Sequence, residues 1–179
     1  MSTITESVRR VPMGWDDYLR LDDTTRGEYY GGALVMTPGP TRQHQNICVW
    51  LTVHLRDAVP AGMDVSLGWG WSPAGTHTEY IPDVMVHPAT QESTRFTGIP
   101  LLAVEVLSTN RRDDLVEKAT AYAARGLRDY WIVDPRDHVL MAYALVDGMY
   151  ELRSEHTEGV AALTFADVAV ALDLGALFA

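Results

Sequence analysis

The sequence predicts an α/β fold in which a mixed β-sheet is flanked by helices. Residues 81–86 and 101–107 are short segments dominated by aliphatic and β-branched residues, which is typical of buried strands. A third such segment, residues 130–135, follows the second after a helix-like stretch. This order predicts two parallel strands joined by a right-handed helical crossover.

The N-terminal part is expected to form a short helix, a hairpin and a long helix. We expect the short helix at residues 13–20 and the hairpin at 27–36, with Gly31-Gly32 as its turn. Thr41 is a suitable N-cap for a helix over residues 41–58. At about 100° per residue, one stripe of this helix is apolar and expected to be buried. The stripe consists of His44, Ile47, Cys48, Leu51 and Leu55. The other side carries Val49, Trp50 and Val53, which favours cover by a second copy of the protein.

The remaining elements are predicted in sequence order. We expect a strand at residues 63–71, a polar connection at 89–100, a helix at 113–125 closed by Gly126, a meander at 139–153 and a C-terminal stretch at 165–178 over the sheet edge. We expect a single domain, residues 1–179, with a core at about 17–150 and C-terminal strands and a tail at 151–179.

Two acids stand where core residues would be expected. Asp83 and Glu105 each lie on one of the two apolar strands. Because a buried carboxylate without a partner is costly, this pattern predicts a bound cation. The sequence has no cysteine pair and no HExxH motif, so oxygen ligands for Mg²⁺ or Mn²⁺ are favoured over a zinc site.

The only lysine of the chain, Lys118, is predicted on the helix that follows the Glu105 strand. A wheel places it at the border of a buried stripe formed by Leu115, Ala119 and Tyr122. The strand–helix order carries Lys118 back toward Glu105, where an ammonium group would orient water and stabilise phosphate charge. A lysine that extends from the helix border into solvent is an equally good interpretation of the geometry alone.

Bulk composition limits the other functions. The net charge of −10 opposes nonspecific attraction to nucleic acid, although a local basic groove is compatible with it. No membrane-spanning or secretory segment is found, and we expect a soluble, cytoplasmic protein. Cys48 is assigned no chemical role, since a single cysteine on a buried helix face behaves as a small hydrophobe. Taken alone, Glu28 is interpreted as a solvated carboxylate at a strand end, and His44 is interpreted as a structural histidine.

Several segments taken together resemble a known family. They are residues 26–32, 36–40 with Arg42, His44 and Gln45, then 82–83, 104–108, 117–118 with Tyr122, and 129–135. In order and spacing they are similar to the putative restriction endonuclease branch of the PD-(D/E)XK nuclease superfamily, over residues 17–150. The usual lysine of the superfamily lies two residues after the second acid, where this chain has Leu107. Gly27 and Gly31 also replace larger residues expected beside Glu28.

The resemblance implies a restriction-endonuclease-like core and divalent-metal-dependent cleavage of nucleic acid, with DNA favoured as substrate. It implies Asp83 and Glu105 as metal ligands, Lys118 as the catalytic lysine and Glu28 as an additional acid. His44, Arg111 and Arg112 are candidates for substrate binding, and a homodimer is expected because superfamily members frequently form one.

Two other functions are compatible with the same residues. The first is a catalytically inactive interaction or regulatory protein with the nuclease fold, which the acidic net charge favours. The second is a metal-dependent hydrolase of a small phosphorylated compound. An enclosed pocket would favour the latter, and a basic surface near Arg111, Arg112, Arg125 and Arg128 would favour a polymer.

Overall fold

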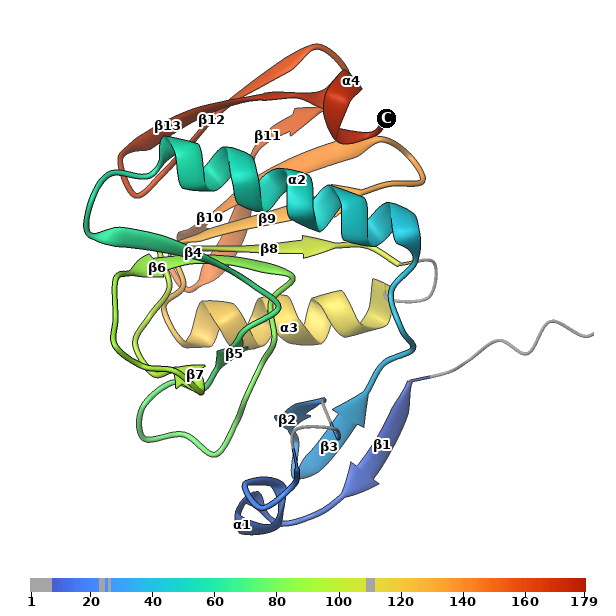
Figure 1. Ribbon diagram of the computed structural model, residues 1–179, viewed down its shortest axis with the longest axis vertical. Helices are drawn as coiled ribbons and strands as arrows, with labels where there is room; N and C mark the ends of the chain where they lie inside the picture. The colour runs from blue at the N-terminus through green and yellow to red at the C-terminus, as the bar shows by residue number, and fades with distance from the viewer. Residues whose placement is uncertain (1–7, 23–24, 26, 109–111) are drawn as a thin grey trace, which may run out of the picture.

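A six-stranded mixed sheet runs through the centre of the protein (Figure 1). The structure, a computed structural model, describes residues 8–22, 25, 27–108 and 112–179. The strand order is β11 (Met149–His156), β10 (Val139–Val146), β9 (Asp129–Asp134), β8 (Leu102–Val106), β6 (Val84–Pro88) and β4 (Met63–Leu67). β8 and β9 are parallel and the other neighbours are antiparallel. The predicted α/β class, the central place of β8 and the parallel crossover are confirmed.

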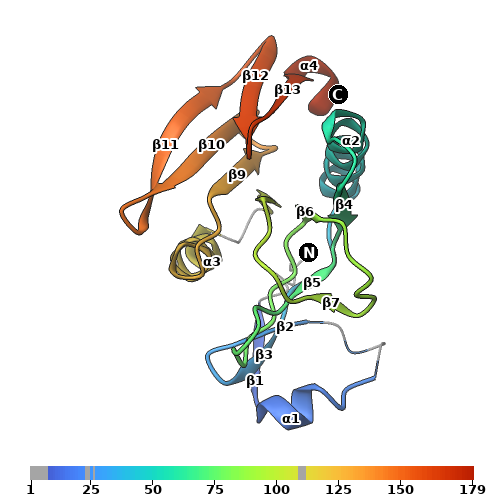
Figure 2. The same ribbon diagram turned by 90° about the vertical axis from the view of Figure 1, so that its left-hand side faces the viewer.

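Two helices cover opposite faces of this sheet (Figure 2). α2 (Arg42–Ala58) begins after Thr41, whose hydroxyl accepts a hydrogen bond from the backbone N–H of His44 at 3.2 Å. The buried residues of α2 are the five of the predicted stripe. Its other side exposes half of Val49 and of Val53. Within the described residues, no helix is both long and apolar enough to cross a bilayer.

α3 (Arg112–Ala124) covers the other face and corrects one prediction. Lys118 and Tyr122 are fully buried, whereas Leu115 is only half-buried. Placing Lys118 at the border of the stripe was therefore wrong. The reason is that Glu28 and Glu105, which belong to other segments, lie opposite the lysine. A helical wheel drawn for one helix contains no information about residues outside it.

A small antiparallel sheet lies beside the main one, with strand order β1 (Arg9–Pro12), β3 (Ala33–Met36) and β2 (Glu28–Tyr30). The expected hairpin is confirmed, because Gly31 and Gly32 form its turn at φ of 61° and 72°, which glycine adopts without strain. The expected N-terminal helix is shorter than predicted, as α1 spans only Trp15–Tyr18.

The segments between α2 and β8 differ from the prediction in detail. The strand predicted at residues 63–71 is divided into β4 and β5 (Gly70–Trp71), because Gly68 has a positive φ of 54°. The connection at residues 89–100 contains a strand that was not predicted, β7 (Arg95–Phe96), which pairs with β5. Two paired residues are too few for an alternating pattern to be visible in the sequence.

The C-terminal segment covers a face of the sheet and not its edge, so that prediction was wrong. β12 (Val160–Phe165) and β13 (Val168–Asp173) pair as a hairpin, and α4 (Leu174–Leu177) follows. Their alternate residues join the hydrophobic core that also contains the buried side of α2. The Phe165 ring meets Trp131 of β9 edge to face, with centroids 5.6 Å apart.

Candidate active site

A fully buried lysine lies at the centre of the candidate site. Nζ of Lys118 is 3.3 Å from Oε1 and 3.2 Å from Oε2 of Glu105, the penultimate residue of β8. Tyr122, one turn further along α3, donates its hydroxyl to Oε1 of Glu105 at 2.9 Å. Burial, and then the charge of Glu105, raises the pKa of Tyr122 well above its ordinary value, so this hydroxyl stays a donor. The predicted approach of Lys118 to Glu105 is thus observed.

Glu28 reaches the same lysine from the small sheet. Tyr29 and Glu79 exchange two backbone hydrogen bonds, of 2.7 and 2.8 Å, which hold β2 against the segment that leads to Asp83. Oε1 of the neighbouring Glu28 accepts the N–H of Ile81 at 2.8 Å and lies 2.9 Å from Nζ of Lys118. Glu28 is 5% exposed, so its interpretation as a solvated carboxylate was wrong. Oε2 of Glu28 is buried and has no hydrogen-bond partner among the described residues.

Asp83 lies immediately before β6, next to the end of β8. Its Oδ2 accepts the N–H of Val106 at 2.8 Å and is 3.2 Å from Nε2 of His44 in the first turn of α2. Burial disfavours the ionised form of Asp83, but the hydrogen bond and charge of His44, the Val106 N–H and the charge of Lys118 together outweigh it. They lower the pKa of Asp83 below its ordinary value, so the carboxylate is ionised at neutral pH.

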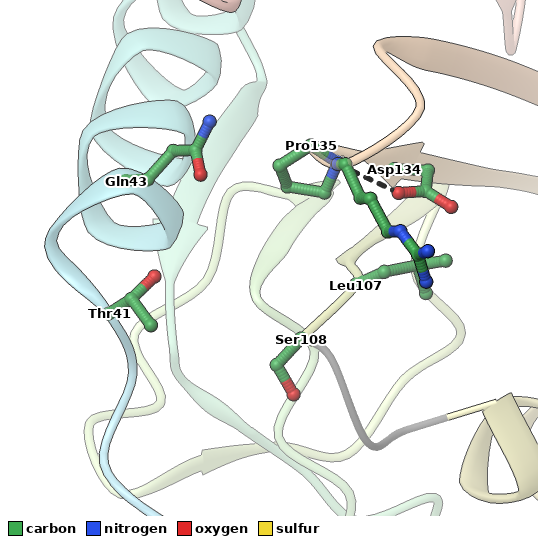
Figure 3. Close-up of a pocket in the computed structure, with 7 residues that line it drawn as sticks. Thr41, Gln43, Leu107, Ser108, Asp134 and Pro135 are labelled. Carbon is green, nitrogen blue, oxygen red and sulfur yellow. Dashed lines mark hydrogen bonds between the residues drawn. The ribbon is translucent and has the colours of Figure 1, made fainter.

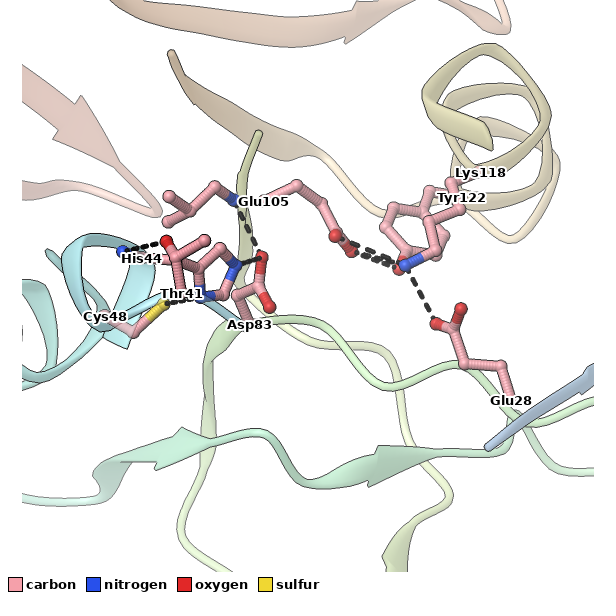
Figure 4. Close-up of polar contacts among 9 residues, drawn as sticks. Glu28, Thr41, His44, Cys48, Asp83, Glu105, Lys118 and Tyr122 are labelled. Atoms are coloured by element: carbon pink, nitrogen blue, oxygen red, sulfur yellow. Dashed lines mark hydrogen bonds and ion pairs between the residues drawn. The ribbon is translucent and has the colours of Figure 1, made fainter. Parts of the chain in front are cut away.

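These residues form two adjoining groups at one end of the sheet. Figure 4 shows Glu105, Lys118, Tyr122 and Glu28 in contact on one side, and Asp83 pointing toward His44 on the other. The two groups are linked through β8, because Glu105 and the residue that donates to Asp83, Val106, are consecutive. The four residues proposed as the catalytic set therefore gather at one place, but their carboxylates do not converge on a single point.

The donor set fits a divalent cation. Glu28 and Glu105 contact the single ammonium group of Lys118, and Asp83 adds a third carboxylate beside His44, so these acids outnumber the ammonium group by two when all are ionised, the imidazole of His44 apart. Burial makes such an excess unfavourable, and Glu28 Oε2 is a buried carboxylate oxygen without a described donor. The contacts of Asp83 with His44 and with the Val106 N–H both use its Oδ2. Carboxylate oxygens are the ligands that Mg²⁺ and Mn²⁺ prefer.

A pocket of about 200 Å³, with a mixed polar and apolar lining, lies between the start of α2 and the ends of β8 and β9 (Figure 3). Its lining comes from the start of α2 and from the ends of β8 and β9, namely Thr41, Gln43, Leu107, Ser108, Asp134, Pro135 and Arg136. Oδ1 of Asp134 accepts the backbone N–H groups of Arg136 and Asp137 at 2.9 and 3.2 Å, which fixes the turn after β9. Thr41, which lines the pocket, also caps the helix turn that carries His44.

The other predicted residues have different outcomes. His44 touches Asp83 directly, and the structure places its second ring nitrogen beside Cys48. Arg111 lies outside the described residues, and the side chain of Arg112 is not described either. Two contacts were missed by sequence reasoning, those of Tyr122 and Cys48. In each case the available signal was a spacing of four residues from a site residue, Lys118 or His44.

Comparisons with known proteins identify a family and a shared fold. A family model described as "Uma2: Putative restriction endonuclease" matches residues 15–173. Among solved structures, the chain is similar to that of a putative nuclease belonging to DUF820 from Anabaena variabilis ATCC 29413. The TM-score is 0.77 at 18% identity, over 93% of this chain and 98% of that chain, so the two share a fold. The comparison with curated proteins found no match.

Proposed function

The chain belongs to the Uma2 family of putative restriction endonucleases, and from this premise we propose that it is a divalent-metal-dependent nuclease that hydrolyses phosphodiester bonds, in DNA by preference. The observation that supports this most strongly is Lys118, a fully buried ammonium group held by two acids from separate segments. Burying a charge costs roughly several kcal/mol unless partners compensate it. An apolar side chain would serve a purely structural role at this position without that cost.

Each residue has a defined part in this proposal. Asp83 and Glu105 would hold Mg²⁺ or Mn²⁺, which when bound would polarise a phosphate oxygen and lower the pKa of a water molecule. Lys118 stabilises the charge that builds up on the phosphate and orients water. Glu28 positions Lys118, since its Oε1 lies 2.9 Å from Nζ. Tyr122 fixes Glu105 through its hydroxyl.

Substrate binding is proposed for His44, Arg111 and Arg112. The pocket of about 200 Å³ is large enough for a phosphate group and includes Arg136 at its rim. A homodimer is part of the same proposal, and the exposed Val49 and Val53 on α2 are the surface that supports it.

The test is cleavage of DNA and RNA by purified protein with Mg²⁺ or Mn²⁺. We expect wild type to cut, and Asp83→Asn and Glu105→Gln to lose more activity than the roughly 100-fold typical of outer-shell metal-site substitutions. Asp57→Asn, a matched change at an exposed position of α2, is expected to leave the rate unchanged. Equal rates for wild type and both site variants would refute the proposal.

A catalytically inactive protein would behave differently in a binding measurement. Calorimetric titration with Mn²⁺ is expected to release or absorb heat with wild type and to lose that signal in Glu105→Gln. Absence of both heat and cleavage in wild type would instead support a regulatory nuclease-fold protein, which the net charge of −10 favours.

A further inference from the structure

A second set of potential metal ligands lies on the α2 side of Asp83. Cys48 Sγ is 3.6 Å from Nδ1 of His44, and Nε2 of His44 is 3.2 Å from Oδ2 of Asp83 (Figure 4). One ligand atom from each residue lies within 4.8 Å of the other two, and in the described part of the chain this is the one such set of three. The thiol takes no part in the proposed nuclease chemistry.

We propose that His44, Cys48 and Asp83 form a site for a thiophilic transition-metal ion, and that the ion bound under physiological conditions is Zn²⁺. A thiolate, an imidazole and one carboxylate select Zn²⁺ over Mg²⁺, because soft sulfur and nitrogen ligands favour it. The fourth ligand is solvent, which reaches the site from the Asp83 side. The Asp83 side chain is 15% exposed, whereas Cys48 is 4% exposed.

The distances are close to those that the ion requires. In tetrahedral zinc, with Zn–S near 2.3 Å and Zn–N near 2.0–2.1 Å, the sulfur and nitrogen ligands are about 3.5–3.6 Å apart. The observed separation of Cys48 Sγ and His44 Nδ1 is 3.6 Å. An imidazole offers one nitrogen to one ion, so an ion held by Cys48 Sγ and His44 Nδ1 requires the Asp83 carboxylate to leave Nε2 of His44 and rotate toward the ion. The three ligand atoms start within 4.8 Å of one another, and the widest pair has to close by about 1 Å.

The helix holds the two strongest ligands in place. His44 and Cys48 are four residues apart on α2 and therefore project from the same face. The Thr41 cap fixes the first turn, in which His44 lies. Few residues need to be ordered when the ion binds, since both side chains are already buried against the sheet.

Asp83 belongs to both sets of ligands, which has a functional consequence that depends on the proposed nuclease activity. A zinc ion bound by Cys48 and His44 recruits Asp83 and so removes it from the proposed Mg²⁺ ligands. We therefore expect Zn²⁺ to inhibit the Mg²⁺-supported reaction, with Cys48→Ser relieving the inhibition. The binding site itself does not depend on that activity.

Cobalt(II) absorption tests the site without any activity measurement. Titration of reduced, purified protein with Co²⁺ is expected to produce the near-ultraviolet band of a cobalt–thiolate bond and the visible bands of tetrahedral cobalt. Equimolar Zn²⁺ is expected to remove them and excess Mg²⁺ to leave them. Cys48→Ser is expected to abolish the thiolate band, and His44→Asn to weaken binding at least 10-fold, while His54→Asn on the same helix serves as the matched control.

The two proposals fail separately. Glu105→Gln is expected to keep the cobalt bands, because Glu105 is not in this set, and to lose cleavage. Absence of the thiolate band in wild type, or its persistence in Cys48→Ser, would overturn the zinc site and leave a hydrogen-bonded Cys48–His44–Asp83 chain. Nuclease activity would be unaffected by that result.

Discussion

Replacing Lys118 with methionine removes the ammonium group that contacts both Glu28 and Glu105 while keeping most of the side-chain volume. Lys118 is 0% exposed and its Nζ lies 2.9 Å from Glu28 and 3.2 Å from Glu105. Removing one partner of a buried ion pair costs about 3–5 kcal/mol, because the remaining charge is left uncompensated. For a domain of this size the midpoint of thermal unfolding should fall by about 6–20 °C.

Urea unfolding at neutral pH measures this loss, and two further variants make it specific. Glu117→Gln changes the neighbouring residue, whose ion pair with Arg10 is about half exposed, and should cost less than about 1 kcal/mol. The double variant Lys118→Met, Glu28→Gln should recover part of the loss, because it removes one of the two stranded charges. A loss below about 1 kcal/mol for Lys118→Met would refute the reasoning, since no uncompensated charge would then be buried.

Three further predictions concern single contacts. Tyr122→Phe removes a hydroxyl that donates to a buried carboxylate and should cost about 1.5–3 kcal/mol in urea unfolding; a neutral effect would contradict this contact. Gly27→Ala should cost about 1–3 kcal/mol, because a Cβ there would lie 2.8 Å from the carbonyl oxygen of Val35, and an unchanged melting temperature would exclude the close approach. Asp83 has a lowered pKa in the folded state, so its stabilising contribution is present above its ordinary pKa of 3.8 and disappears as the pH falls further; the stability difference between wild type and Asp83→Asn should therefore shrink on acidification, and a pH-independent difference would disprove the His44 contact.

The elements of the core were predictable because their patterns are local. The alternation and apolar content of β8 and β9, and the stripe of α2, each follow from burial of one short segment. The acids were predictable for the opposite reason, since Asp83 and Glu105 conflict with the apolar strands around them. The conflict shows that a partner exists, and the sequence contains just one lysine to supply it.

The parts that could not be predicted depend on contacts between distant segments. The place of Glu28 results from the Tyr29–Glu79 backbone bridge, which joins residues 50 positions apart and leaves no mark on either segment. Gly27 counted against the family resemblance, but the structure explains it, because Leu34 and Val35 pack where its side chain would be. Cys48 was interpreted as an ordinary core residue, since its four-residue spacing from His44 does not by itself show that His44 turns toward it.

The site residues lie where regular structure begins or ends. Glu28 is the first residue of β2, Asp83 precedes β6, Glu105 is next to the end of β8, and His44 lies in the first turn of α2. β6 and β8 are antiparallel, with Val84 opposite Val104. The start of β6 and the end of β8 therefore lie at the same end of the sheet. A shift of one residue in this register would move every side chain of β6 to the other face. Val84 and Val86 pack in one part of the core and Met85 in the other, and this packing sets the position of Asp83 beside Val106 and His44.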